Sequence, residues 1–345
     1  MKLAIIFGSS SNEHDVSVVS AASIIKNLDK NKYKITPIYL DSNNKFYLWK
    51  EDIKKIKPLT IGILPTNLEP IKDPFSYLKT FDCVFIMIHG KNGEDGILSS
   101  ILEFEKIPYV GNKPRASMIT MDKILTKDLL ERNGIKTAKY ISFMKYNDEY
   151  ILKGESYSLK EVLKKIKSEM NFPLFIKPAN SGSSIGVSKV TNSEELKTGI
   201  LNALEIDNRI LVEEGIIGKE LECGILEENK MISASVIGEI KPAEEFYSFD
   251  AKYKNVESKT IIPANISKSD RDEIRKTAIK AFKILDLHGF SRIDFFLTEN
   301  HEIILNEINT IPGFTEISMY PKLWEESGIP YSKLLDTLIK ESIKK

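Results

Sequence analysis

Two absences limit the kinds of protein that this sequence can encode. Of its 345 residues only Cys83 and Cys223 are cysteine, so a disulfide framework and a cysteine-based zinc site are excluded. No run of about 18 apolar residues occurs, and no membrane-spanning helix is expected. The apolar run at residues 3–7 is too short for the core of a signal peptide, which makes the cytosol the expected compartment.

The chain also lacks an excess of charge of either sign. It contains 49 Lys and Arg against 49 Asp and Glu, so its formal net charge is zero. Without a global positive field, neither nucleic acid nor an anionic membrane is expected as a partner. With 42% hydrophobic and 28% charged residues the composition is that of a globular protein, and its length suits two or three domains.

Strand and helix patterns alternate through the first third of the chain. Apolar runs such as residues 3–7 and 83–88 predict strands, and residues 16–28 have helical spacing. This alternation predicts an α/β fold with a mostly parallel, doubly wound sheet. Ligands of such sheets gather at the carboxyl ends of the strands, where the loop 8–15 and His89 are expected.

The rest of the chain has the patterns of mixed helix and strand units. A strand at residues 171–178 leads into a Gly/Ser-rich loop, and residues 269–285 predict an amphipathic helix with Ser269 as its N-cap. Between them, residues 242–262 are polar and aromatic without a clear period. Long stretches of this kind in a compact domain are more often functional than idle.

Oxygen ligands for a hard cation occur near the end of the chain. One predicted strand contains Arg292 and Asp294, and the next contains Glu307 and Asn309. Residues two apart on a strand point to the same face. Two carboxylates and an amide oxygen suit Mg²⁺, which leaves room for phosphate, and a neighbouring arginine is typical of phosphoryl transfer. Any one of these residues alone is more simply explained as a solvated charge at a strand end.

Two further segments could bind a nucleotide. The loop at residues 179–186, Ala-Asn-Ser-Gly-Ser-Ser-Ile-Gly, could cradle phosphates with its N–H groups, and Lys177 before it could add a point charge. It is neither a Walker motif nor a dinucleotide fingerprint, and a flexible hairpin is an equal alternative. The turn that contains Gly215 and Gly218 could present its main chain to an adenine edge, with Glu213 accepting from the exocyclic amine, or it could be a solvated turn.

Two N-terminal loops carry polar candidates. Glu13 precedes a predicted helix, where it is either a cap favoured by the helix dipole or a partner for a ligand ammonium. His89 begins the glycine-rich loop at residues 89–96 after a buried strand, which places it at the expected edge of a site.

Taken together, these segments resemble the D-alanine–D-alanine ligase family of the ATP-grasp superfamily. The family's motifs occur in order over nearly the whole chain, and their joint occurrence is far more specific than any one of them. The matching segments are Asn12-Glu-His-Asp-Val-Ser17, His89-Gly-Lys-Asn-Gly-Glu-Asp-Gly96, Met121-Asp-Lys123, Ile176-Lys-Pro178, Gly182-Ser-Ser-Ile-Gly186, Asp250-Ala-Lys-Tyr253, Ser291-Arg-Ile-Asp294 and Asn306-Glu-Ile-Asn-Thr-Ile-Pro-Gly-Phe-Thr315.

The resemblance implies an ATP-grasp fold with three domains. Residues 1–112 would form the N-terminal α/β domain on the first-substrate side, and residues 113–212 the central ATP-grasp subdomain. Residues 213–345 would form the C-terminal domain with the metal site. ATP would be clamped between the last two domains. A mobile loop within residues 242–262 would close over the reaction, because water destroys an acyl phosphate.

The resemblance also implies the reaction and its cofactors. The carboxylate of a first D-alanine would attack the γ-phosphate of ATP, giving D-alanyl phosphate and ADP. The amine of a second D-alanine would then attack the acyl carbon, and phosphate would leave. The dipeptide would feed peptidoglycan synthesis and so cell wall biogenesis and cell shape. The implied cofactors are ATP and two Mg²⁺ ions, with Mn²⁺ as an alternative, and a homodimer is the family's habit.

Site residues are implied one by one. Glu13 would face the first ammonium, and Arg292 with the Gly313 amide would stabilise the tetrahedral intermediate. Lys252 and Ser318 would meet the second carboxylate. The implied catalytic residues are Glu13, Ser183, Tyr253, Arg292 and Gly313, the substrate-binding residues His89, Lys252 and Ser318, the nucleotide-binding residues Lys123, Lys177, Ser184, Glu213, Glu214, Ile216, Glu220 and Phe296, and the metal ligands Asp294, Glu307 and Asn309.

One segment departs from the family pattern. Residues 316–318 are Glu-Ile-Ser where some members have Ser-His-Ser. Relatives that make D-alanyl-D-serine or D-alanyl-D-lactate often have arginine at the position of Met319, and many D-lactate makers lack a match to Tyr253. These two residues therefore favour D-alanine as second substrate, with D-serine and D-lactate as alternatives. A catalytically silent nucleotide-binding protein would lack a metal ligand or a phosphate lysine, and none is missing.

Overall fold

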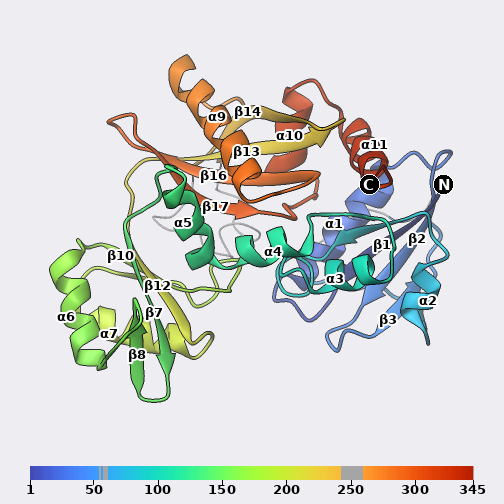
Figure 1. The fold of residues 1–345 in the computed structure, drawn as a ribbon. Helices are drawn as coiled ribbons and strands as arrows, with labels where there is room; N and C mark the ends of the chain where they lie inside the picture. Colours follow the sequence, from blue (N-terminus) through green and yellow to red (C-terminus); the bar gives the residue numbers. More distant parts are fainter. Residues whose placement is uncertain (54–55, 57–60, 242–258, 345) are drawn as a thin grey trace.

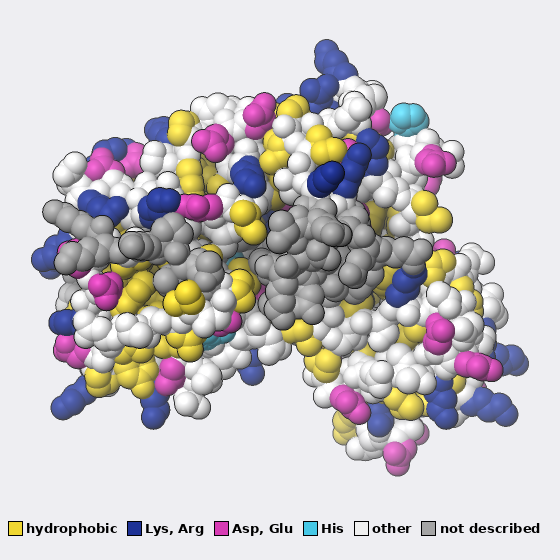
Figure 2. Space-filling model, turned by 180° about the vertical axis from the view of Figure 1, so that it is seen from behind, with side chains coloured by type: hydrophobic (Ala, Val, Ile, Leu, Met, Phe, Trp, Pro, Cys, Tyr) yellow, Lys and Arg dark blue, Asp and Glu magenta, His cyan; other side chains and the backbone are white. Residues whose placement is uncertain are grey.

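Three β-sheets follow one another along the chain in the part that the computed structural model describes, and helices pack on each (Figure 1). The structure describes all residues except 54–55, 57–60, 242–258 and 345. The mixed α/β fold confirms the predicted class. Within these described ranges, no helix is both long and apolar enough to cross a membrane. Acidic and basic side chains are interspersed over the face shown in Figure 2, consistent with the balanced composition.

The N-terminal sheet has the strand order β4-β3-β2-β1-β5-β6. Strands β1, β2, β5 and β6 are parallel, which confirms the predicted parallel core, and β3 and β4 extend it antiparallel at one edge. The elements of this part are β1 (Lys2–Gly8), α1 (His14–Asn27), β2 (Lys34–Leu40), β3 (Phe46–Trp49), β4 (Leu68–Pro70), α2 (Pro74–Leu78), β5 (Cys83–Met87), α3 (Ile97–Phe104) and β6 (Tyr109–Val110).

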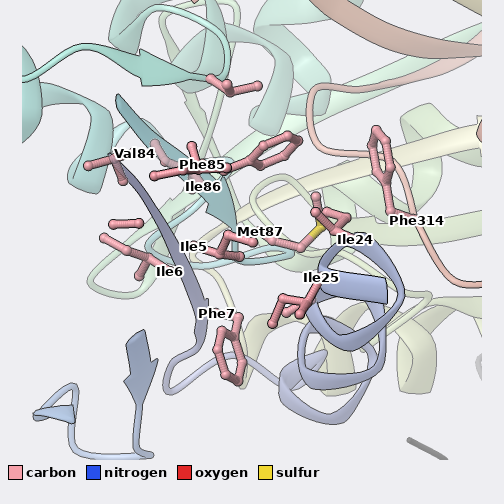
Figure 3. Close-up of a cluster of buried hydrophobic side chains, with 14 of the residues drawn as sticks. Ile5, Ile6, Phe7, Ile24, Ile25, Val84, Phe85, Ile86, Met87 and Phe314 are labelled. Atoms are coloured by element: carbon pink, nitrogen blue, oxygen red, sulfur yellow. The ribbon is translucent and has the colours of Figure 1, made fainter. Parts of the chain in front are cut away.

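The core of this first part includes residues from the far end of the chain. Strands β1 and β5 are almost entirely buried, as expected for parallel strands covered on both faces. Figure 3 shows Ile24 and Ile25 of α1 and the C-terminal Phe314 beside these strands. The Phe314 ring lies 6.1 Å from the ring of Phe85, centroid to centroid. This contact fixes the segment around Phe314 against the N-terminal sheet.

The middle sheet is antiparallel, with the order β11-β10-β12-β7-β8-β9. Its strands β10 and β12 carry the segments predicted to bind a nucleotide. The elements from α4 to β12 are α4 (Pro114–Met121), α5 (Lys123–Arg132), β7 (Tyr140–Tyr146), β8 (Glu149–Leu152), β9 (Glu155–Tyr157), α6 (Leu159–Glu169), β10 (Leu174–Pro178), β11 (Ser188–Val190), α7 (Ser193–Leu204) and β12 (Arg209–Glu214).

The C-terminal sheet is also antiparallel, with the order β15-β14-β13-β16-β17. Helix α9 packs on β14 and β13, and α11 reaches the N-terminal sheet at β6 (Figure 1). The elements are β13 (Lys219–Glu228), β14 (Met231–Lys241), β15 (Lys259–Ile261), α9 (Lys268–Ile284), β16 (Phe290–Leu297), β17 (Ile303–Asn309), α10 (Met319–Glu326) and α11 (Tyr331–Ser342).

The predicted N-cap of α9 is wrong by two residues. Ser267, not Ser269, has the extended backbone of a cap, and its hydroxyl accepts a hydrogen bond from the Asp270 N–H at 3.0 Å. The Ser267 hydroxyl also donates to the Asp270 carboxylate. Both serines fit the helical pattern of the sequence, and only the backbone conformation distinguishes them.

Candidate active site

A cleft between the middle and C-terminal sheets, here called the first cleft, collects most of the predicted site residues. All eight residues that the resemblance assigns to nucleotide binding line it, together with two predicted metal ligands. These residues are Lys123, Lys177, Ser184, Glu213, Glu214, Ile216, Glu220 and Phe296, with Asp294 and Glu307. The fold thus brings together four segments that are far apart in the sequence, and their contact with a nucleotide stays a prediction.

The predicted metal ligands come from two neighbouring strands. Asp294 of β16 lies opposite Glu307 of β17, and Arg292 lies opposite Asn309. The Asn309 amide donates a hydrogen bond to Asp294, with 3.1 Å between Nδ2 and Oδ2. The side chains share one face of the sheet, as their spacing predicts.

A β-bulge in β17 determines which residues turn toward the first cleft. The register shifts at Asn306, which is the extra residue between Leu305 and Glu307. Because of this shift Leu305 and Ile308, three residues apart, both reach the hydrophobic core. Asn306 and Glu307 both line the cleft. Bulges often aim side chains in this way near functional sites.

Arg292 is held between two carboxylates. Its guanidinium donates to both oxygens of Asp294, Nε to Oδ1 at 2.8 Å and Nη2 to Oδ2 at 2.7 Å. Its Nε also lies 3.0 Å from Oε2 of Glu222, a residue that is not among the predicted site residues. Burial acts to lower the pKa of Arg292, but Asp294 and Glu222 outweigh it and raise that pKa well above its usual value. Arg292 therefore remains a cation.

The donor set fits a hard divalent cation. Asp294, Glu307 and Asn309 supply two carboxylates and one amide oxygen beside a cleft that can hold phosphate oxygens, which is the ligand chemistry that Mg²⁺ prefers. In the described part of the chain, no cluster of three or more His, Cys, Asp or Glu side chains has the arrangement of a metal site. A cation here would consequently depend on the amide and on ligand oxygens. Its binding stays a prediction.

The predicted phosphate lysines already have protein partners. Lys123 at the start of α5 donates to the Ser181 carbonyl oxygen, and Lys177 forms an ion pair with Glu213. Burial lowers the pKa of Lys123, and the nearby Lys177 lowers it further, although carboxylates, Glu307 foremost, oppose the shift. An anion in the cleft would favour the charged form of Lys123.

The loop between β10 and β11 has an unusual backbone. Ser183 and Ser184 have φ values of 49° and 59°, in the left-handed region that non-glycine residues seldom adopt. Both side chains line the first cleft. Such conformations in consecutive residues are typical of loops shaped for a ligand rather than for their own stability.

A second cleft adjoins the first. It contains six of the eight residues predicted to act in catalysis or to bind the substrates, and Ser183, Glu222, Ile240 and Glu307 border both clefts. The other two, Tyr253 and Lys252, lie outside the described residues. The six are Glu13, His89, Ser183, Arg292, Gly313 and Ser318.

Two of these residues connect the N-terminal and middle parts of the chain. The hydroxyl of Ser183, in the loop after β10, donates to the carboxylate of Glu13, which precedes α1. Their positions are 170 residues apart. Glu13 occupies the N-cap position of α1, as one of the two predicted alternatives has it, but its side chain makes no capping hydrogen bond.

His89 is a buried imidazole with a partner at each ring nitrogen. Its Nδ1 lies 2.8 Å from the Ile311 carbonyl oxygen, so Nδ1 carries the proton and donates, while Nε2 lies 3.0 Å from the Ser20 hydroxyl. Burial lowers the pKa of His89, with Arg292 adding to the effect. His89 thereby links the N-terminal sheet to the segment that leads to Gly313.

Glu94 is a partly buried acid that was predicted only as part of the loop after β5. Its carboxyl accepts from the Gly90 N–H at 2.9 Å and from the Ile311 N–H at 2.8 Å. Burial, assisted by the charge of Glu13, raises the pKa of Glu94 to about 7. In the sequence, the glycine-rich loop at residues 89–96 is the feature that could have identified Glu94 as a site residue. In the structure Glu94 lines the second cleft.

Gly313 packs closely against Ser318, which would have to move if position 313 carried a side chain. A Cβ atom at this position would be 2.6 Å from the Ser318 hydroxyl oxygen. That hydroxyl also accepts a hydrogen bond from the Thr315 N–H at 3.0 Å. The close packing holds the turn at residues 313–318 in one shape at the edge of the second cleft.

The parallel N-terminal sheet, two antiparallel sheets and the clefts between them define the ATP-grasp class of fold. Within that class the chain belongs to the D-alanine–D-alanine ligase family. Residues 2–112 match the family model described as D-ala D-ala ligase N-terminus, and residues 129–340 match the one described as D-ala D-ala ligase C-terminus.

Individual relatives agree with this membership. A D-alanine–D-alanine ligase of Geobacillus thermodenitrificans is 39% identical over 98% of this chain and 94% of its own, and one of Clostridium acetobutylicum is 41% identical over 98% and 96%. The solved D-alanine–D-alanine ligase of Coxiella burnetii matches with a TM-score of 0.82 at 32% identity, covering 100% of this chain and 94% of that one. The solved VanG D-Ala:D-Ser ligase of Enterococcus faecalis matches with a TM-score of 0.81 at 34% identity over 99% of both chains.

Proposed function

We propose that this chain catalyses the ATP-dependent ligation of two D-alanine molecules to D-alanyl-D-alanine. The observation that carries this proposal is the shared wall of the two clefts. Ser183, Glu222 and Glu307 border both, so a nucleotide in the first cleft and amino acids in the second would meet beside Arg292. Family membership supports the same reaction, because the relatives are named for it.

ATP would occupy the first cleft. Lys123 and Lys177 would bind its phosphates, and the strand end at Glu214 with the following turn at Ile216 would face the adenine. Asp294, Glu307 and Asn309 would hold Mg²⁺. The ion, when bound, would neutralise phosphate charge and orient the phosphates. Lys177 and Arg292, fixed in advance by carboxylates, suit transfer of a phosphoryl group, since catalysis of that step depends mainly on positioning and charge.

The amino acids would occupy the second cleft. Glu13, aligned by Ser183, would accept from the ammonium of the first D-alanine. Arg292 and the Gly313 N–H would donate to the oxyanion of the tetrahedral intermediate, and Ser318 would donate to the second carboxylate. Removing one such preorganised donor typically lowers kcat about 100- to 1000-fold. The chain's own residues thus bind, orient and stabilise charge at each step.

The test is product formation by the purified chain. With ATP, Mg²⁺ and D-alanine we expect phosphate release and a dipeptide of the mass of D-alanyl-D-alanine, and neither with L-alanine. Mixtures of D-alanine with D-serine or D-lactate would show by mass whether the second site accepts either. Folded protein that releases no phosphate and forms no dipeptide would refute the proposal. If D-alanyl-D-serine or D-alanyl-D-lactate forms in larger amount than D-alanyl-D-alanine, the chain is instead a D-alanine–D-serine or D-alanine–D-lactate ligase.

A Glu307→Gln variant tests the metal assignment separately. Glutamine keeps the size of the side chain and removes the charge opposite Asp294. We expect kcat to fall by about 100-fold or more, with an unchanged unfolding temperature. Unchanged phosphate release would contradict the assignment of Glu307 without contradicting the reaction.

Location and assembly follow as further proposals from the family. We infer a cytoplasmic enzyme of peptidoglycan precursor synthesis that acts as a homodimer. Sedimentation velocity of the purified chain would test the assembly.

A further inference from the structure

A buried lysine outside both the predicted site and the first cleft interacts with the nucleotide-binding residues. Lys127 lies one turn after Lys123 on α5, and its side chain is only 4% exposed. Its Nζ lies 3.0 Å from Oε2 of Glu213, whose side chain is 6% exposed. The other carboxylate oxygen of Glu213 contacts Lys177. One buried carboxylate thus joins a lysine of the first cleft to a lysine that does not line it.

The surroundings hold Lys127 in place. Ile124, three residues earlier and on the same helix face, packs on Ala179 and Leu211 of the middle part of the chain. Asp122 caps the helix by accepting from the N–H groups of Ile124 and Leu125, both at 3.0 Å. Helix α5 is therefore firmly seated, and Lys127 has little freedom to leave Glu213.

The charges of this cluster do not balance. Two ammonium groups share one carboxylate, so the three side chains of Lys127, Lys177 and Glu213 together carry one positive charge in excess. Burial alone would raise the pKa of Glu213, but Lys127 and Lys177 outweigh it and lower that pKa to about 2. The carboxylate is therefore ionised at neutral pH, and Lys177 is the lysine of the pair that faces the first cleft.

We propose that Lys127 is a positioning residue of the nucleotide site: it fixes the Glu213 carboxylate, and Glu213 in turn orients Lys177 toward the nucleotide phosphates. This rests on the proposed function only in taking the ligand of the first cleft to be an adenine nucleotide. Lys127 does not line the first cleft, so it would act on a nucleotide there through Glu213. Its contact with Glu213 is an ion pair rather than a well-aligned hydrogen bond, so the effect depends on charge.

The test is ADP affinity, measured by calorimetry in the presence of Mg²⁺ and without D-alanine. At metal sites, loss of a residue that orients a ligating side chain lowers the affinity about 10- to 100-fold. Because Lys127 would orient Glu213 and Lys177 in a similar way, we expect a K127M variant to bind ADP more weakly by about the same factor. Its KM for D-alanine should stay within about twofold of the parent value. A matched control is K139M, because Lys139 pairs with Glu214 at 3.5 Å but is 57% exposed. The control should bind ADP as the parent does.

A double-mutant cycle separates positioning from a purely structural role. If Lys127 acts through Glu213, the K127M change should have no further effect on ADP affinity in an E213Q background. The K127M/E213Q variant has no buried carboxylate left without its lysine partner. Its ADP affinity can therefore be compared with that of E213Q even if K127M alone does not fold.

Two results would overturn the proposal. One is a folded K127M variant that binds ADP as tightly as the parent. The other is a K127M/E213Q variant that binds ADP about tenfold more weakly than E213Q. Because neither readout requires dipeptide formation, an absence of ligase activity would refute the proposed function and leave this inference standing.

Discussion

The two cysteines illustrate how position decides the chemistry of a side chain. Both are fully buried, and Cys83 also contacts the Ser342 hydroxyl, 3.1 Å away. Burial raises the pKa of Cys83 to about 11 and that of Cys223 to about 12. Since the thiolate is the reactive form, neither residue is expected to react in the folded protein.

Thiol labelling at pH 8 therefore reports unfolding. In the native protein we expect no reaction with a chromogenic disulfide reagent on the timescale of minutes, and two thiols per chain after addition of denaturant. One thiol that reacts rapidly without denaturant would contradict the burial of that cysteine.

Glu94 introduces a pH dependence of stability. Its pKa in the folded chain is raised from the ordinary 4.5 to about 7, so the folded state binds a proton more tightly than the unfolded state. The resulting stabilisation is complete below about pH 4.5 and is lost as the pH rises through about 7.

A Glu94→Gln variant should lack that loss. Between pH 5 and pH 8 we expect the free energy of unfolding of the parent chain to fall relative to the variant by on the order of 1–3 kcal/mol. Urea unfolding at the two pH values measures the difference. Equal pH dependence of both chains would show that Glu94 titrates normally.

At the scale of elements, the segment after β17 joins the hydrophobic core to the second cleft. Phe314 is fully buried, and its ring packs against Phe290 and Tyr320 of the C-terminal part as well as Phe85 of the N-terminal sheet. Its neighbour Gly313 lines the second cleft. The position of the predicted oxyanion donor consequently depends on an aromatic cluster drawn from both ends of the chain.

Phe314→Ala should weaken both stability and substrate binding. We expect a loss of about 3–5 kcal/mol in the free energy of unfolding, and a rise in the KM for D-alanine larger than any rise in the KM for ATP. Phe104, which is 84% exposed, provides the control, because F104A removes the same atoms without leaving a cavity. Equal effects of the two substitutions in urea unfolding and kinetics would refute the coupling.

Secondary structure was predictable where a pattern is long and buried. Strands β1 and β5 and helix α1 lie within one or two residues of the predicted ranges. The strands β7, β8 and β9 were not predicted, because few of their residues are fully buried and they are stabilised by pairing with one another and with β12. The bulge at Asn306 was also missed, since no residue type marks it in the sequence.

At the scale of the whole molecule, the first cleft exists only because the middle and C-terminal sheets face each other. The predicted boundary between residues 212 and 213 falls inside β12, whose last residues Glu213 and Glu214 still belong to the middle sheet. We propose to place the boundary after Glu214, in the turn that leads to β13. A nucleotide in the cleft would then contact both sides of this boundary.

Ligand binding should accordingly stabilise the whole chain. At 100 times its dissociation constant, ADP with Mg²⁺ should add about 2.7 kcal/mol to the free energy of unfolding, and a thermal melt should remain a single transition. A K177M variant, which lacks a lysine of the cleft, should gain much less at the same ADP concentration. A melt in which only one of two transitions moves would show that the nucleotide does not bridge the two sheets.

The sequence by itself determined the fold class, the family and the residue types of the site, because these depend on local periodicity and on motifs a few residues long. Only the tertiary structure decided which charges are paired. Lys127 resembles a solvent-exposed helix residue in the sequence, and Glu222 an ordinary strand residue, yet each is buried against a site residue that is distant along the chain. Such contacts have no local signal, since they arise when separate sheets and helices exclude water from the same space.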